Sequence, residues 1–287
     1  MKSLLNTDCL FPSSLEETLL LLNNPDERGT VLAGGSDLMA QWHADTSDIP
    51  ERVISIFNLT ELRGISHQNE TVIIGAGTTH AEIHSSPLIQ THLPALAQAA
   101  LSVGAVQIQS RGTIGGNIAN ASPAGDLAPS LLITDGRVVA SSVNGERFID
   151  LNNFFLDYRC VDLRPNELIT RFELPFLSVG EKSIFKKLSP RSAQSISKIM
   201  GACLGSAVKG VISSFRVSLG SVAATAVRLR NIEEWITGKT ISEDVLLEVE
   251  DMVFSSINPI ADIRSSAEYR LQTASKMVRG FINYISE

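Results

Sequence analysis

Cysteine is scarce in this chain of 287 residues, which contains only three. Cys9, Cys160 and Cys203 lie far apart in the sequence, so they cannot supply the four cysteine ligands of an ordinary iron–sulfur cluster. They also make a poor disulfide framework. We therefore expect three reduced, partly buried thiols, and any iron–sulfur cluster that works with this chain must belong to another one.

Long apolar runs and an excess of positive charge are missing as well. No stretch approaches the roughly 20 apolar residues of a membrane span, and Met1 to Asp8 has no long apolar region of a secretory signal. The formal net charge of −7 argues against a nucleic-acid-binding protein, which is usually basic. The composition, 44% hydrophobic and 19% charged, is that of a globular protein. The sequence predicts a cytoplasmic protein.

Hydrophobic patterning predicts an α+β protein with two domains, 1–176 and 177–287. The boundary is placed at Pro175 to Gly180, where proline and glycine break the pattern. In the first domain, helices are expected at 14–24, 37–44, 79–83, 93–103 and 128–132, and strands at 30–32, 52–57, 71–74, 137–142, 146–150 and 168–174. The second should have strands at 183–188, 201–208 and 215–221, then helices at 231–235, 243–254 and 268–284.

Two short glycine-rich loops are the most informative feature of the chain. The first is Ala33-Gly34-Gly35-Ser36-Asp37, and the second is Thr113-Ile114-Gly115-Gly116-Asn117, followed by Asp126. Glycine has no Cβ and tolerates positive φ, so successive N–H groups can converge on one oxygen. Thr113 and Asn117 add side-chain hydrogen bonds, and a carboxylate such as that of Asp126 suits the diol of a ribose or ribityl group. Together the loops predict a diphosphate-bearing cofactor held between two subdomains.

Other interpretations of these residues are weaker. Neither loop has the lysine of a P-loop or the G-x-G-x-x-G pattern of a Rossmann fold. Each could be a tight turn in which glycine serves the backbone only. His80 and His84 would share one helix face with Glu82 between them, but this is not the H-E-x-x-H order of a zinc protease. We interpret that face as solvated or capping.

The segment from Gly112 to Pro129 resembles the FAD-binding signature of the molybdenum hydroxylases. This family includes xanthine dehydrogenase, aldehyde oxidase and aerobic CO dehydrogenase. Leu32 to Leu38 is similar to its first flavin loop, and Arg264 to Arg270 resembles its C-terminal domain. The resemblance covers essentially the whole chain. It implies a PCMH-type FAD-binding domain of two α/β subdomains, followed by a smaller domain like the C-terminal domain of the CO dehydrogenase flavoprotein.

The resemblance also implies which residues hold FAD. The diphosphate would lie along Val31, Leu32, Ala33, Gly34, Gly35, Ser36 and Asp37 on one side and Thr113, Ile114, Gly115, Gly116 and Asn117 on the other. Asp126 would meet hydroxyls of the cofactor. Val103 and Ile169 would pack near the flavin, and Lys186 matches a lysine associated with FAD. Tyr158 matches a position near the nicotinamide, although Asp157 and Ser195 stand where relatives usually have Gly and Asp.

A family member of this length would be the separate FAD-binding subunit of an oxidoreductase. Its partners would be a large subunit with molybdopterin and a small subunit with 2Fe-2S clusters, in a dimer of heterotrimers. Electrons would pass from the clusters through FAD to NAD. Two alternatives stay open: the same flavin subunit with oxygen or a quinone as acceptor, and a scaffold subunit without flavin.

Overall fold

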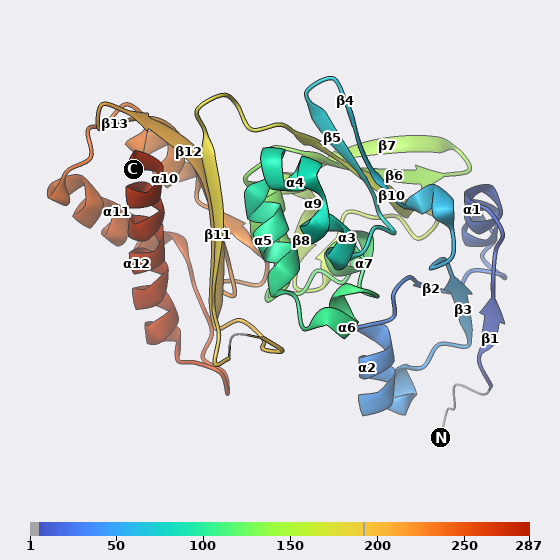
Figure 1. Cartoon of the computed structure of the whole chain (residues 1–287). Coiled ribbons are helices and arrows are strands. Elements are labelled where there is room, and N and C mark those ends of the chain that lie inside the picture. The colour runs from blue at the N-terminus through green and yellow to red at the C-terminus, as the bar shows by residue number, and fades with distance from the viewer. Residues whose placement is uncertain (1–5, 192) are drawn as a thin grey trace.

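Three units follow one another along the chain, each built on its own β-sheet (Figure 1). The computed structural model describes residues 6–191 and 193–287. The first five residues, which belong to the segment judged for a secretory signal, lie outside the described residues. Among those described, no helix is long and apolar enough to cross a membrane.

The N-terminal unit is a parallel sheet with the strand order β1-β3-β2, that is Asp8–Leu10, Arg52–Ser55 and Thr30–Leu32. Helix α1 (Leu15–Asn23) connects β1 to β2. Helix α2 (Leu38–Ala44) and a short 3-10 helix (Thr46–Asp48) connect β2 to β3, and a second 3-10 helix (Thr60–Leu62) follows β3. The Ser14 side chain caps α1 by accepting a hydrogen bond from the Glu17 N–H. In a sheet of parallel strands, ligands bind beyond the carboxyl ends, and β2 runs directly into the first glycine loop there.

The middle unit is an antiparallel sheet with the order β4-β5-β10-β6-β7. Its strands are Ile65–Gln68, Thr71–Gly75, Leu168–Pro175, Arg137–Ser142 and Gly145–Asp150. Gly145, at φ +113°, makes the hairpin turn between β6 and β7. The helices of this unit are α3 (His80–Ser85), α4 (Pro87–His92), α5 (Pro94–Ser102), α6 (Val106–Gln109), α7 (Ile114–Ala119), α8 (Leu127–Leu132) and α9 (Leu151–Phe154). A small hairpin of β8 (Phe155–Asp157) and β9 (Cys160–Val161) precedes β10.

The C-terminal unit is an antiparallel sheet with the order β11-β12-β13-β14, that is Lys182–Leu188, Ile199–Val208, Val211–Gly220 and Val227–Arg228. Helices α10 (Arg230–Ile236), α11 (Glu243–Ser256) and α12 (Ala267–Ser286) pack on it through one apolar core. Phe185 and Met200 instead join the core of the middle unit. Packing is therefore continuous across the predicted domain boundary, which stays a prediction.

Candidate functional site

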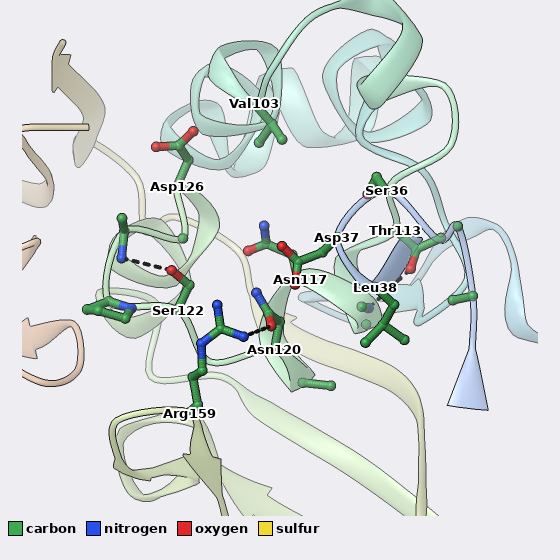
Figure 2. A pocket seen from close by; sticks show the side chains of 18 of the residues that line it. Ser36, Asp37, Leu38, Val103, Thr113, Asn117, Asn120, Ser122, Asp126 and Arg159 are labelled. Carbon is green, nitrogen blue, oxygen red and sulfur yellow. Dashed lines mark hydrogen bonds between the residues drawn. The ribbon is translucent and has the colours of Figure 1, made fainter. Parts of the chain in front are cut away.

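A cavity of about 940 Å³ lies where the three units meet. This volume is at the upper end of the range for small-molecule and cofactor sites, about 300–1,000 Å³. Its walls come from the first glycine loop, the second glycine segment, the β8–β9 hairpin and the C-terminal unit. Figure 2 shows side chains from Ser36, Asn117, Asp126 and Arg159 around this space. The topology thus brings together residues that are far apart in the sequence.

The first glycine loop presents free backbone donors to the cavity. Within the described residues, none of the N–H groups from Gly34 to Asp37 donates to a protein acceptor. Gly35 has φ +74°, a left-handed conformation that favours glycine. An ideal Cβ on Gly34 would lie only 1.7 Å from the Arg111 carbonyl oxygen, so the two glycine-containing segments touch here through their backbones. Four successive donors beside a cavity suit an anionic oxygen group.

The second glycine segment is not the donor-rich loop that we predicted. Thr113 is the N-cap of helix α7, and the segment forms the first turn of that helix. The N–H groups of this turn are all bonded within the protein: Ile114 to Thr78 O, 3.0 Å; Gly115 to Ala76 O, 2.8 Å; Gly116 to Thr113 Oγ1, 3.1 Å; Asn117 to Thr113 O, 3.0 Å. Gly115 and Gly116 also lack positive φ. The glycines therefore provide space rather than free N–H groups.

That space lies around Gly116 and Asn117. Gly116 is exposed and lines the cavity, and an ideal Cβ there would meet only Thr113 Oγ1, at 3.1 Å. Gly115 is buried, and its Cβ would lie 2.8 Å from Ala76. The Asn117 Oδ1 atom is buried, and no described residue donates a hydrogen bond to it. An unpartnered buried oxygen is costly, so its presence beside a cavity indicates a ligand that completes its hydrogen bonding.

Asp126 lies in a buried network with Lys187 and Ser197, two residues that the sequence analysis did not select. The Lys187 Nζ atom, not that of Lys186, donates to Asp126 Oδ2 at 2.6 Å, and Ser197 Oγ donates to Oδ1 at 2.8 Å. Because side chains alternate along β11, the Lys186 side chain is exposed while that of Lys187 reaches Asp126; neither lysine lines the cavity itself. Burial raises the pKa of Asp126, and Lys187 opposes that shift. Each carboxylate oxygen keeps capacity to accept from a ligand.

The remaining predicted residues divide into two groups. Val103, Ile169 and Tyr158 line the cavity, and Tyr158 is 58% exposed. Leu32 and Ile114 do not line it, because their side chains pack into apolar cores of the N-terminal and middle units. Apart from Lys186, the other predicted site residues all line the cavity: Val31, Ala33, Gly34, Gly35, Ser36, Asp37, Thr113, Gly115, Gly116, Asn117 and Asp126.

His80 is buried rather than solvated, contrary to our interpretation of its helix face. It lines the cavity, only 2% of the residue is exposed, and Nδ1 has no hydrogen-bond partner in the part of the chain that the structure describes. The capping interpretation holds for its neighbours, since Thr79 and Glu82 form a capping box at the start of α3. Burial lowers the pKa of His80 from 6.5 to about 4, so the imidazole is neutral near neutral pH.

We expect His80 to make the protein less stable in acid. Its pKa is lower in the folded state, so the unfolded chain binds more protons between pH 6.5 and about 4. Stability should fall as pH drops through this window, by up to roughly 3 kcal/mol for His80 alone. Urea denaturation of the wild type and His80→Gln over this pH range would measure the effect. The contributions of the other titrating groups cancel when the free energies of unfolding of the two proteins are subtracted. Parallel stability–pH curves for the two proteins would contradict the prediction.

Part of the cavity wall comes from residues that sequence reasoning did not select. Ser221, Asp262, Arg264 and Arg270 extend the wall onto the C-terminal unit. We used the segment from Arg264 to Arg270 only as a point of family resemblance. A sequence signal exists for Arg270, because it shares the apolar face of α12 with Ala274 and Val278 at helical spacing. A charged residue on such a face is rarely buried without a partner.

Comparison with known protein families accounts for this architecture. The family described as the FAD binding domain in molybdopterin dehydrogenase matches residues 5–177, and the CO dehydrogenase flavoprotein C-terminal domain matches residues 184–285. The chain belongs to the FAD-binding medium subunits of the molybdenum hydroxylases. It is therefore an oxidoreductase subunit, and the expected fold is confirmed.

Individual relatives of this FAD-binding subunit match it over nearly their whole length. The carbon monoxide dehydrogenase medium chain of Hydrogenophaga pseudoflava is 30% identical, covering 95% of this chain and 94% of its own. A putative xanthine dehydrogenase FAD-binding subunit of Escherichia coli is 32% identical, with coverage of 92% and 90%. The solved carbon monoxide dehydrogenase of H. pseudoflava superposes with a TM-score of 0.90, at 30% identity and 96% and 95% coverage.

The residues present fit the FAD that the family implies. The first glycine loop offers four free N–H donors, and the space at Gly116 lies beside the unpartnered Asn117 Oδ1. Apolar side chains such as Ile169 supply surface for a ring system, while Asp126 can accept from hydroxyls. These groups complement FAD, which has an anionic diphosphate at its centre, an apolar ring system and hydroxyl-bearing sugar groups.

Proposed function

We propose that this subunit carries electrons from 2Fe-2S clusters of a partner subunit through FAD to NAD, in a xanthine dehydrogenase-like enzyme. When bound, FAD would supply the redox chemistry, and the protein would supply position and electrostatics. The observation that carries the proposal is the lining of the cavity. Besides the glycine segments, which would hold FAD, Tyr158, Ile196 and Arg264 line the same cavity, where NAD would meet the flavin.

The roles of individual residues follow from their contacts. The N–H groups from Gly34 to Asp37 would bind the diphosphate, and Gly116 would allow its close approach. Asn117 Oδ1 would accept a hydrogen bond from the cofactor. Lys187, rather than Lys186, would hold Asp126 in place for a cofactor diol. Leu32 and Ile114 would act through their packing, with no direct side-chain contact.

The bound flavin should be FAD and not FMN. An anion site made of four N–H groups together with a separate diol-binding carboxylate suits a dinucleotide, whereas FMN has a single phosphate. We expect chromatography of the flavin released on denaturation to give FAD alone. Release of FMN, or of no flavin from protein isolated with its partners, would contradict this prediction.

The acceptor is tested by reoxidation of the reduced flavin. In the complete complex, reduced by substrate without oxygen, we expect rapid mixing with NAD⁺ to restore the flavin absorption band at the rate of turnover. Oxygen and a soluble quinone are tested in parallel. One observation favours them: the Asp157 carboxylate, which accepts the Tyr158 N–H at 2.7 Å, brings negative charge beside the position proposed for nicotinamide binding. Reoxidation by oxygen or quinone, but not by NAD⁺, would support that alternative.

The partners belong to the same proposal. Relatives of this chain carry names such as carbon monoxide dehydrogenase medium chain, which imply other subunits in those enzymes. We propose that this subunit associates with a molybdopterin-binding large subunit and a 2Fe-2S small subunit, as a dimer of heterotrimers. Purification from the native host, with mass spectrometry of the intact complex, would measure the composition. A flavin-loaded chain without partners would contradict it.

A further inference from the structure

Two buried hydrogen-bonding groups on the C-terminal wall of the cavity have no partner among residues 6–191 and 193–287. These are Ser221 Oγ and Arg270 Nε, which belong to residues only 5% and 4% exposed. Both residues line the cavity. A polar group that is buried without a partner loses its hydration and gains nothing in return. Two such groups on one wall therefore indicate a ligand.

Contacts within the protein hold both groups in place. Arg270 Nη1 donates to the Ser221 carbonyl oxygen at 2.8 Å, and Nη2 donates to Asp262 Oδ1 at 2.8 Å. The Ser221 N–H donates to the Pro123 carbonyl oxygen at 2.8 Å, which ties this wall to the segment between Asn117 and Asp126. Ser221 also has φ +64°, a conformation that costs energy in a residue other than glycine. Strain of this kind is concentrated at binding sites.

The charge of the wall is positive. Arg264 Nη1 lies 2.9 Å from Asp262 Oδ2, so two guanidinium groups share one carboxylate. One positive charge is left without a neutralising partner in this cluster. The Arg270 Nε–H and the Ser221 hydroxyl can both donate, so an anionic oxygen group would satisfy them together.

We infer that Ser221, Asp262, Arg264 and Arg270 form a subsite for an anionic phosphate or carboxylate group of a molecule bound in the cavity. The inference rests on the proposed function, since the molecule is either FAD, through its diphosphate, or the dinucleotide that accepts its electrons. Arg270 and Ser221 would donate to the anion, and Asp262 would orient the guanidinium groups.

Two variants of the full chain test the subsite. Arg270→Lys keeps the charge beside Asp262 but removes Nε, and Ser221→Ala removes only the hydroxyl. The control is Arg279→Lys on the same helix, where the arginine pairs with Glu243 and Glu250 outside the cavity. Binding of FAD to the flavin-free chain is measured by fluorescence titration. Binding of NADH to the FAD-loaded chain is measured by anaerobic calorimetry. An NADH analogue that cannot reduce the flavin is titrated as well, to separate binding from reduction. Circular dichroism confirms the fold of each variant.

We expect Arg270→Lys to lower the affinity for one of these ligands by about tenfold or more. Ser221→Ala should lower it by about threefold to tenfold, because each variant loses a hydrogen bond to a charged group. Weaker FAD binding assigns the subsite to the flavin diphosphate. Unchanged affinity for FAD together with weaker binding of NADH assigns the subsite to the electron-accepting dinucleotide. Wild-type affinity for both ligands in both folded variants would overturn the inference while leaving FAD binding intact. Failure of the wild type to bind FAD would instead refute the proposed function.

If Arg270→Lys proves too unstable to study, Ser221→Gly keeps the inference testable. Glycine removes the same hydroxyl and relieves the positive φ, so this variant should be at least as stable as the wild type. We expect it to weaken the same ligand as Ser221→Ala does. Tight binding by both Ser221 variants would overturn the role of the hydroxyl.

Discussion

Gly116→Val should leave the protein folded but without flavin. Gly116 faces the cavity in the first turn of α7, and outside the helix backbone the one described atom that an added Cβ would approach is the Thr113 hydroxyl oxygen. The two methyl groups of valine would occupy the space where the cofactor must approach the backbone. We expect the affinity for FAD to fall by roughly a thousandfold or more, equivalent to about 4 kcal/mol. Flavin fluorescence titration of the apoprotein would measure this loss.

The fold should survive this substitution, because valine is no worse than glycine as a helix former. Gly116 also has no positive φ, so strain in the backbone is not the cause of the effect. Gly280→Val is the matched control, since Gly280 lies within helix α12 and an ideal Cβ there meets nothing within 4 Å. This variant should bind FAD like the wild type. A yellow Gly116→Val protein with normal flavin content would rule out the proposed position of the diphosphate.

The second large effect concerns catalysis by the isolated subunit. We expect no oxidation of purines or aldehydes by this chain alone, because the family resemblance assigns molybdopterin and the 2Fe-2S clusters to partner subunits. The three thiols agree with that division. Cys9 lies on β1, Cys160 on β9 and Cys203 on β12, three strands that belong to three different sheets. Burial also raises the pKa of Cys203, which opposes formation of a thiolate ligand.

Turnover should appear only when the partner subunits are added. Substrate oxidation by the purified chain is measured before and after mixing with the large and small subunits. As a control, the FAD-loaded chain alone should retain weak oxidation of NADH with an artificial acceptor, which shows that the flavin is intact. Turnover of a purine or aldehyde by the chain without partners would overturn the assignment of the redox centres.

Much of the fold could be predicted because its signals are local. Alternating apolar residues predicted the strands around Thr71–Gly75 and Leu168–Pro175, and Asn144-Gly145 predicted the hairpin between β6 and β7. The short elements were missed, among them β1 (Asp8–Leu10) and β4 (Ile65–Gln68). A strand of three or four residues carries too little pattern to be distinguished from a loop, and its pairing comes from distant residues.

The two glycine segments, in the order of a flavin-binding family, could be recognised from the sequence alone, since each motif is continuous and depends on backbone freedom. How those segments work depends on the folded chain. Pairing with Ala76 and Thr78 uses the N–H groups of the second segment, while those of the first stay free. The alternation of side chains along β11 places Lys187, and not Lys186, in contact with Asp126. The packing of α12 brings Arg270 to the cavity. Such choices depend on contacts between residues far apart in the chain, which no local pattern records.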